Sequence, residues 1–249
     1  IAGADPFDST SSPVISHQSS GKQKDKFTIG IPESFVAMDG LDADVQKNFQ
    51  STIEKLKEEG YRVKPLELPS LPHALAVYYV LMPAEVSANL ARYDGIRYGF
   101  SHNAEKLMDV YMESRGLGFG REVRRRILLG TYVLSAGYYD AYYNNAIAVR
   151  RLITEELMRA FAEVDVIATP TSPSPAFKLG EKNADPLTMY LEDIFTVPGN
   201  ITGIPGISVP SGKVLRDAIA LPIGIQFMAA PFHEHTLFAI GKAVERVCG

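Results

Sequence analysis

The first third of the chain has a pattern of apolar and polar positions that predicts a strand, a helix and a second strand. Residues 27–32 form a short β-branched run that ends in proline, which indicates a strand. Residues 61–68 indicate the second strand, and a strand–helix–strand unit favours a parallel pair. Asp42 or Asp44 can cap the helix between them. Its apolar side chains recur every three or four residues, as expected for one buried face: Val45, Phe49, Ile53 and Leu56.

The middle of the chain predicts a series of helices. Residues 72–92 are rich in Ala, Val, Leu and Met, and we expect a helix there that Pro83 interrupts. A short amphipathic helix is expected at residues 104–112. Residues 118–143 predict a helix, a glycine-bearing break and the start of a longer helix that continues to about residue 164. The longer helix should bury one stripe of side chains: Tyr139, Tyr142, Ala146, Val149, Ile153, Leu157 and Phe161.

The last third of the chain returns to strands. Residues 165–170 indicate a buried strand, and a loop of Pro, Ser and Thr follows at residues 171–175. Ligands bind beyond the strand ends of open α/β sheets, so this loop is a candidate pocket wall. We expect a helix that Asp185 caps and that carries Asp193, then an irregular connection at residues 198–205. Two strands (206–210 and 221–228), a hairpin-type loop between them (213–218) and a closing helix (235–247) complete the pattern.

Composition narrows the class of protein. Of the 249 residues, 46% are hydrophobic and 22% are charged, a profile typical of soluble globular proteins. The net charge of -4 argues against nucleic-acid binding through this chain alone, because phosphate contacts need clustered Lys and Arg. The single cysteine, Cys248, excludes an internal disulfide and fits a reducing compartment. No apolar run approaches the roughly 20 residues of a membrane span.

Three consecutive arginines, Arg124 to Arg126, are the first candidate for binding chemistry. Adjacent residues of a helix point about 100° apart, so the three cannot share one face. One guanidinium must therefore point toward the apolar side, beside Ile127 and Leu128, where it needs an acceptor. That acceptor is either an internal carboxylate, with Asp140 the main competitor, or the carboxylate of a ligand.

Asp193 is the second candidate, because it stands among apolar neighbours one turn from Met189 and Tyr190. A carboxylate there caps a helix, pairs with an arginine or binds a cation, and the pattern alone leaves these alternatives open. His233-x-His235 lacks a third ligand at a supporting spacing, so we expect no metal site in this chain.

Several longer phrases resemble one known family. They include Tyr-Asp-Gly-Ile-Arg and Gly-Phe-Gly-Arg-Glu-Val, and they stand in the family's order at residues 1–11, 92–97, 118–130, 137–143, 185–193 and 221–226. Together they resemble the amidase signature family, and within it the A subunits of tRNA-dependent amidotransferases. The resemblance implies an α/β fold with a mixed central sheet and helices on both faces. It implies one domain, with a surface linker (1–26), a strand–helix–strand unit (27–69), a helical layer (70–164) and the remaining strands with the closing helix (165–249).

The resemblance also implies glutaminase chemistry. Such subunits hydrolyse glutamine with a Lys-Ser-Ser triad, and the ammonia converts Glu-tRNA(Gln) to Gln-tRNA(Gln). No serine of this chain stands in a Gly-Gly-Ser-Ser context, so we expect the triad upstream of Ile1, no catalytic residue here and an inactive C-terminal half. The family's glutamine contacts align with Arg126 for the α-carboxylate, Asp193 for the α-ammonium and Tyr78, which stands next to Tyr79.

Partners follow from the same resemblance. We expect the missing N-terminal half, supplied as another polypeptide, together with B and C subunits in a heterotrimer. ATP and magnesium should bind the partner subunit and no cofactor this chain, tRNA should be contacted only indirectly, and the complex should lie in the cytoplasm or an organellar matrix. Two alternatives are a stand-alone amidase of the same family that acts on small amides, and a truncated scaffold without activity.

Overall fold

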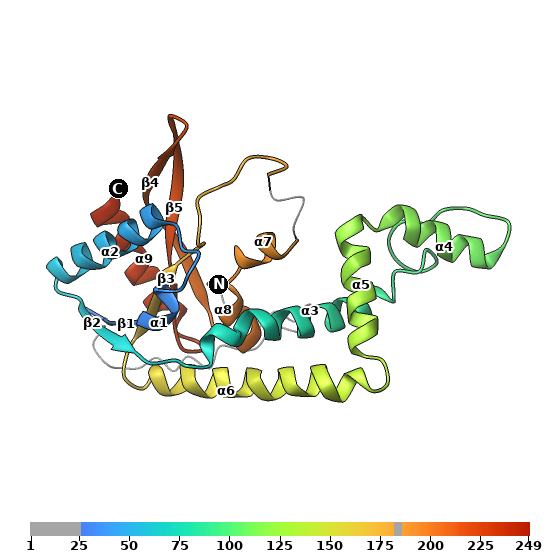
Figure 1. The fold of residues 1–249 in the computed structure, drawn as a ribbon, viewed down its shortest axis with the longest axis horizontal. Coiled ribbons are helices and arrows are strands. Elements are labelled where there is room, and N and C mark those ends of the chain that lie inside the picture. Colours follow the sequence, from blue (N-terminus) through green and yellow to red (C-terminus); the bar gives the residue numbers. More distant parts are fainter. Residues whose placement is uncertain (1–25, 182–185) are drawn as a thin grey trace. The chain divides into compact units, whose positions relative to one another are not determined.

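The computed structural model describes residues 26–181 and 186–249, and these fall into two compact units. One unit combines the chain up to Leu68 with Leu157–Gly249, and the other consists of Pro69–Glu156. The first unit contains the sheet and the second contains helices (Figure 1). The expected linker at residues 4–26, except Lys26, and the expected cap Asp185 lie outside the described residues.

The first unit is organised around a mixed sheet, as predicted. Across the described residues the sheet has five strands in the order β2-β1-β3-β5-β4. The strand β1 pairs in parallel with β2, which confirms the strand–helix–strand unit, and in parallel with β3. The strand β5 is antiparallel to both β3 and β4. The strands span Thr28–Pro32 (β1), Arg62–Leu66 (β2), Val166–Pro170 (β3), Gly206–Arg216 (β4) and Ile219–Met228 (β5).

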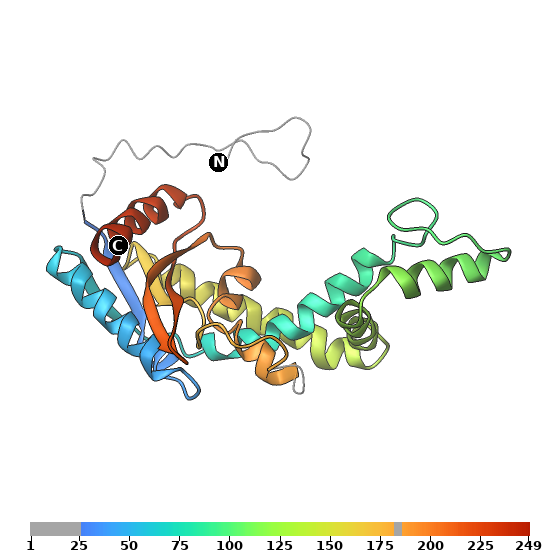
Figure 2. The same ribbon diagram turned by 90° about the horizontal axis from the view of Figure 1, so that it is seen from above.

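Two amphipathic helices cover one face of the sheet. The helices α2 (Ala43–Glu58) and α9 (Glu234–Cys248) pack against each other and against the strands (Figure 2). The carboxylate of Asp42 caps α2, since its Oδ1 accepts from the backbone N–H groups of Asp44 and Val45. The apolar stripe predicted for α2 is buried, and most of it belongs to the core that includes Ile29, Val166, Phe227 and Ile240.

The opposite face of the sheet is covered by shorter pieces. The short helix α1 (Glu33–Val36) places Phe35 edge-on against Phe195, with 5.3 Å between the ring centroids. Gln226, on β5, is buried and donates from Nε2 to the carbonyl oxygen of Phe195 at 2.7 Å and to Thr169 Oγ1 at 3.1 Å. This buried amide joins β3, β5 and the turn before α8, so it fixes the backbone beside Asp193.

The hairpin between β4 and β5 is longer than the sequence suggested. The expected loop at residues 213–218 is wrong, because the paired register continues to Arg216 opposite Ile219. Only Asp217 and Ala218 turn the chain, with φ values of 49° and 62°. Two consecutive positive φ values are typical of the two-residue hairpin turns that match the twist of the strands.

Two short helices replace parts of the expected pattern near the C-terminal strands. The helix α7 (Pro186–Leu191) ends two residues before Asp193, so the expected helix through Asp193 is wrong. The helix α8 (Val197–Thr202) stands where an irregular connection was expected. Its sequence follows helix chemistry, since Pro198 lies in the first turn and Gly203, at φ 73°, ends the helix in the left-handed conformation.

In the second unit, two helices approach each other closely. A 3₁₀ turn (Leu71–His73) leads into α3 (Ala74–Leu90), which continues through Pro83, so the predicted interruption is wrong. The helix α5 (Arg121–Val133) packs on α3. A Cβ atom on Gly130 would lie 1.9 Å from the carbonyl oxygen of Pro83, so only glycine allows this approach.

The helix α4 (Leu107–Gly118) begins three residues after the expected position and continues six residues beyond the expected end. The chain before it forms a turn in which Asp94 Oδ1 accepts from the N–H groups of Ile96 and Arg97. Among the described helices, none combines the length and the apolar character that a membrane crossing requires.

The corner between α5 and the next helix is built from tyrosines. A π-helical turn (Tyr139–Asn144) precedes α6 (Asn145–Ala160). Tyr139 and Tyr142 are 41% and 47% exposed, so the predicted buried stripe begins only at Ala146. A π turn holds more residues per turn than an α-helix, so spacings of three and four do not keep these tyrosines on the buried face. The ring centroids of Tyr138 lie 4.1 Å from Tyr132 and 6.0 Å from Tyr142.

Candidate functional site

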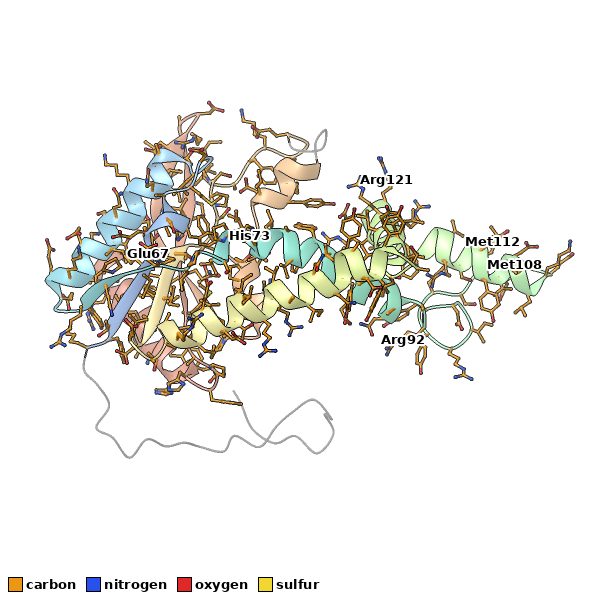
Figure 3. The ribbon with its side chains drawn as sticks, turned by 60° about the horizontal axis from the view of Figure 1, so that its bottom comes forward. Glu67, His73, Arg92, Met108, Met112 and Arg121 are labelled. Atoms are coloured by element: carbon orange, nitrogen blue, oxygen red, sulfur yellow. The ribbon has the colours of Figure 1, made fainter. Side chains whose placement is uncertain are left out.

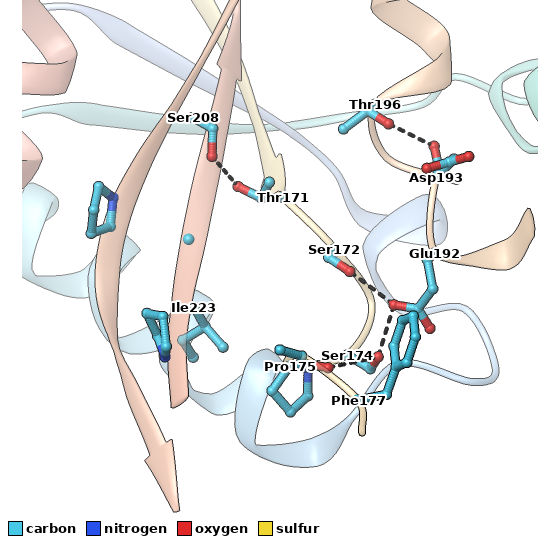
Figure 4. Close-up of a pocket in the computed structure, with 14 residues that line it drawn as sticks. Thr171, Ser172, Ser174, Pro175, Phe177, Glu192, Asp193, Thr196, Ser208 and Ile223 are labelled. Atoms are coloured by element: carbon cyan, nitrogen blue, oxygen red, sulfur yellow. Dashed lines mark hydrogen bonds between the residues drawn. The ribbon is translucent and has the colours of Figure 1, made fainter. Parts of the chain in front are cut away.

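A pocket of about 640 Å³ lies in the sheet unit where β3 ends and the polar loop at residues 171–175 begins (Figure 4). The sequence predicted a pocket wall at this loop, and the structure confirms that the loop lines a pocket. The lining combines polar and apolar side chains from the loop, from the turn before α8 and from both hairpin strands: Thr171, Ser172, Ser174, Pro175, Ala176, Phe177, Glu192, Asp193, Thr196, Ser208, Pro210, Pro222, Ile223 and Gly224.

The loop is attached to the sheet at its first residue. The backbone N–H of Thr171 donates to the carbonyl oxygen of Gly224 at 3.1 Å, and the hydroxyls of Thr171 and Ser208 lie 2.7 Å apart. A Cβ atom on Gly224 would approach Thr171 Oγ1 to 2.9 Å and the carbonyl oxygen of Val209 to 3.2 Å. Glycine at this position therefore lets the loop lie directly against β5.

The opposite wall of the pocket is acidic. Glu192 Oε2 accepts hydrogen bonds from Ser172 Oγ at 3.0 Å and from Ser174 Oγ at 2.8 Å (Figure 4). Asp193 follows directly in sequence and also lines the pocket. The described lining contains these two carboxylates and no Lys or Arg. Such a pocket favours a ligand group that is positively charged.

A tight turn holds Asp193 in place. Its carbonyl oxygen accepts from the N–H groups of Thr196 and Val197, both at 3.0 Å, and from Thr196 Oγ1 at 3.0 Å. The next two residues, Ile194 and Phe195, are 5% and 0% exposed. Because these two side chains are buried, the backbone leaves the helical path after α7, and the exposed Asp193 is presented at the pocket.

In the helical unit, the three arginines point in different directions, as predicted. Arg124 is exposed, whereas the side chains of Arg125 and Arg126 are 41% and 29% exposed. Arg126 Nε donates to Glu122 Oε1 at 2.9 Å, and Arg126 Nη1 lies 3.5 Å from Met82 Sδ. Leu128 is 71% exposed, so the expectation that it marks the apolar side is wrong.

The internal partner of Arg126 is Glu122 and not Asp140. Asp140 Oδ1 instead accepts from Asn144 Nδ2 at 2.7 Å, within its own π turn. Partial burial acts to lower the pKa of the Arg126 guanidinium, but the hydrogen bond and charge of Glu122 raise this pKa above its ordinary value. Arg126 therefore keeps its positive charge although it is partly buried.

Tyr78 and Tyr79 lie on α3 beside Arg126. Both tyrosines contribute to the raised pKa of the Arg126 guanidinium, after the larger effects of burial and Glu122. Their rings meet edge-on, with 5.2 Å between centroids, and both side chains are half-buried. The structure thus brings Tyr78 and Arg126 together in one unit, and it places Asp193 in the pocket of the other. That these three residues bind one ligand stays a prediction.

Sequence reasoning missed the carboxylate beside Asp193 and the serines that it holds. The loop at residues 171–175 was singled out, but Glu192 was not. The available signal was the spacing Ser172-x-Ser174, because alternate residues of an extended segment point to the same side. Two hydroxyls on one side of a loop need a shared acceptor, and Glu192 provides it.

An ion-pair cluster anchors the same loop from the far side. Asp42 donates its backbone N–H to the carbonyl oxygen of Pro173 at 2.9 Å. Arg216 Nη2 donates to both carboxylate oxygens of Asp42, at 2.9 and 2.7 Å, and Arg216 Nη1 donates to Asp44 Oδ2 at 2.7 Å. Burial tends to raise the pKa of Asp42, but the Arg216 and backbone hydrogen bonds lower that pKa below its ordinary value of 3.8.

Replacement of Arg216 by methionine is expected to make stability less dependent on acid pH. The pKa of Asp42 is lower in the folded state than in the unfolded state, so its stabilisation is complete above about pH 3.8 and disappears as the pH falls through the folded pKa. The variant should therefore unfold at a lower temperature than the wild type at pH 7, and the gap should close below pH 3.8. Thermal unfolding from pH 2 to pH 7 measures both.

The matched control is Arg151→Met, which removes an exposed arginine whose pair with Glu155 lies within one helix. Such a pair contributes little, so this variant should unfold close to the wild type throughout. An Arg216→Met gap that stays constant from pH 2 to pH 7 would contradict a role for the Asp42 charge.

The described residues contain no group of three or more His, Cys, Asp or Glu side chains that could hold a metal ion. The rings of His233 and His235 lie 5.7 Å apart. The arrangement is therefore one of binding groups: a carboxylate pocket in the sheet unit, and a charged arginine with two tyrosines in the helical unit.

Comparison with known proteins identifies the family. Residues 1–238 match the family model described as Amidase. The chain belongs to the amidase family. Its mixed sheet agrees with an amidase-family crystal structure, that of the A subunit of the Glutamyl-tRNA(Gln) amidotransferase of Thermotoga maritima, with a TM-score of 0.69 and 35% identity. That match covers 98% of this chain and 48% of the other.

The most similar curated relatives carry one name, the A subunit of Glutamyl-tRNA(Gln) amidotransferase. The chain is 53% identical over 249 residues to the relative from Acidobacterium capsulatum, a match that covers 98% of this chain and 52% of the relative. It is 49% identical over 251 residues to the relative from Roseiflexus castenholzii, a match that covers 99% of this chain and 50% of the relative. The chain thus spans about half the length of the curated relatives it matches.

Proposed function

We propose that this chain is the glutamine-recognising half of an amidotransferase A subunit, which hydrolyses glutamine to supply ammonia for the conversion of Glu-tRNA(Gln) to Gln-tRNA(Gln). The observation that carries the proposal is the 53% identity to the A subunit of a Glutamyl-tRNA(Gln) amidotransferase over nearly the whole chain. Stand-alone amidases share the fold, but the relatives at this level of identity are named as parts of an amidotransferase.

The binding groups suit free glutamine. A charged guanidinium matches the α-carboxylate, and Arg126 keeps its charge beside Tyr78 and Tyr79. An acidic pocket matches the α-ammonium, and Asp193 is the carboxylate that the family resemblance assigns to it. Within the reaction these side chains bind and orient the amide, while the other half of the protein supplies the serine nucleophile and its lysine base. Alone, this chain is inactive.

Exposed apolar side chains support the proposed assembly. Met108 and Met112 project from α4 and are 66% and 68% exposed (Figure 3). Leu107 and Leu117 on the same helix are 62% and 65% exposed. Large apolar side chains gathered on one helix are typical of protein interfaces. We propose that the complete protein assembles with B and C subunits, that ATP and magnesium bind the B subunit, and that the complex works in the cytoplasm or an organellar matrix.

A hybrid protein tests the proposal. In this hybrid, the chain replaces the matching half of the A subunit from Acidobacterium capsulatum, and the product is assembled with the B and C subunits of that organism. We expect ammonia release from glutamine and formation of Gln-tRNA(Gln), both measured directly, at rates within about tenfold of the unmodified complex, because roughly half of the aligned residues are the same.

Two controls separate the alternatives. The 249-residue chain alone should release no ammonia from glutamine, because the triad is supplied by the other half. A hybrid that hydrolyses neutral aliphatic amides as well as it hydrolyses glutamine would instead indicate a general amidase. A hybrid that assembles with B and C but releases no ammonia would indicate a scaffold and would overturn the proposal.

A further inference from the structure

We infer that Glu192 is a positioning residue for glutamine binding, which acts through Ser172 and Ser174 to hold the pocket loop against the turn that carries Asp193. The inference rests on the proposed function and deepens it, because it names a residue that sets the width of the pocket. Glu192 touches the loop and not the reacting amide, so it positions and does not catalyse.

The hydrogen bonds define what Glu192 does. A single oxygen, Oε2, accepts both serine hydroxyls, at 3.0 Å from Ser172 and 2.8 Å from Ser174. Glu192 is half-buried, and hydrogen bonds to a carboxylate are about twice as strong as neutral ones. Residues 171–177 and Glu192–Asp193 line opposite walls of the same pocket, and these two bonds join the walls directly.

The other attachments of the loop go to different parts of the unit. Thr171 binds Ser208 and Gly224 on the hairpin, and the carbonyl of Pro173 accepts from Asp42 before α2. Neither attachment reaches the turn before α8. The Glu192 bonds are the described hydrogen bonds that join the two serines to that turn, so they fix the distance from the loop to Asp193.

The turn itself can transmit this constraint. Ile194 and Phe195 are buried, and the carbonyl of Asp193 accepts from both Thr196 and Val197. A shift of Glu192 would therefore move Asp193 as part of a rigid turn. Loss of the two serine bonds should instead release the loop, since these bonds are its described hydrogen-bonded link to this wall.

Three variants of the hybrid complex test the inference. Glu192→Ala should raise the KM for glutamine about tenfold, with kcat changed less than about threefold, because a hydrogen-bonded acceptor is lost. Glu192→Gln keeps an oxygen that accepts both hydroxyls, so its KM should stay within about threefold of the wild type. Ser172→Ala/Ser174→Ala should match Glu192→Ala, and adding Glu192→Ala to it should raise KM no further, as expected for residues that act as one unit.

Hydrogen–deuterium exchange of the loop peptide at residues 171–181 gives a readout that does not depend on activity. Exchange should be faster in Glu192→Ala and unchanged in Glu192→Gln, because only the first variant releases the serines. Glu58→Ala, an exposed acidic residue on α2, is the matched control and should change neither KM nor exchange.

The possible outcomes are distinct. If Glu192→Gln raises KM as much as Glu192→Ala and loop exchange is the same in both, the carboxylate charge binds glutamine directly and the positioning role is wrong. Normal exchange and normal KM in Glu192→Ala would also overturn it. If the wild-type hybrid releases no ammonia, the proposed function fails, and the exchange data still decide whether Glu192 holds the loop.

Discussion

Arg126→Ala in the hybrid complex is expected to lower kcat/KM for glutamine by about two orders of magnitude or more, because a charged hydrogen-bonding group is removed from the ligand carboxylate. Within the part of the chain that the structure describes, Glu122 and Met82 engage the Nε and Nη1 donors of Arg126. The Nη2 donors can therefore serve a ligand, and the raised pKa keeps the group charged. Steady-state ammonia release at varied glutamine concentration gives the measurement.

Asp193→Ala should produce a loss of similar size, because the same ligand is held at its α-ammonium. The control for both is Arg124→Ala, which removes an exposed arginine of the same helix as Arg126 and should leave kcat/KM unchanged. Arg126→Lys should recover only part of the activity, since a lysine keeps the charge but not the planar fork. Near-normal glutaminase activity in both alanine variants would show that these residues do not bind glutamine.

Gly130→Ala is expected to destabilise the helical unit by about 3 kcal/mol or more, the upper range for overpacking, because the added atom meets backbone. The new Cβ would lie 1.9 Å from the carbonyl oxygen of Pro83 and 2.6 Å from Ser87 Cβ. A flexible side chain could move aside, but the backbone of α3 cannot without separating α3 from α5. Chemical denaturation of the hybrid protein, followed by circular dichroism, would measure the loss.

The matched control is Gly116→Ala, in α4, where no heavy atom lies within 4 Å of the new Cβ. This substitution should stabilise the helix by about 0.5–1 kcal/mol, since alanine restricts the unfolded chain more than glycine does. Equal effects of the two substitutions would mean that α3 and α5 do not approach each other as closely as the structure has them.

Elements with local signals were predictable from the sequence. The helix α2 has a capping aspartate, a stripe at spacings of three and four, and a glycine at φ 91° just beyond its end. Strands β1 and β2 are short and bounded by turn residues, and the helix between them requires a parallel crossover. Each signal lies within a few residues of the feature that it predicts, so no tertiary information is needed.

Elements that depend on distant contacts were not predictable in the same way. The strand β4 continues through Lys213 to Arg216 because it pairs with β5 and because Arg216 binds Asp42 and Asp44, more than 170 residues earlier in the chain. The π turn at Tyr139–Asn144 has no recognised sequence signal, so the tyrosines were assigned to a regular buried stripe. Burial of Ile194 and Phe195 ends α7 before Asp193.

The candidate site was partly visible in the sequence. Helical geometry alone required one arginine of three to point inward, and Arg126 is less exposed than Arg125, whereas Arg124 lies at the surface. Its partner Glu122 stands one turn earlier, a spacing that the sequence contained but that Asp140 obscured. The joining of Ser172 and Ser174 to Glu192 crosses about 20 residues of chain and needed the fold.

The tyrosine-rich corner gives the molecule a built-in optical label. The chain has 12 tyrosines and no tryptophan, and ten of the tyrosines lie in Pro69–Glu156. A hydrogen bond with Tyr138, together with some burial, raises the pKa of Tyr132 to about 12. Intrinsic ultraviolet fluorescence therefore reports the helical unit almost alone, whereas far-ultraviolet dichroism averages over both units. Comparing the two signals during denaturation reveals, without any introduced dye, whether the helices melt before the sheet.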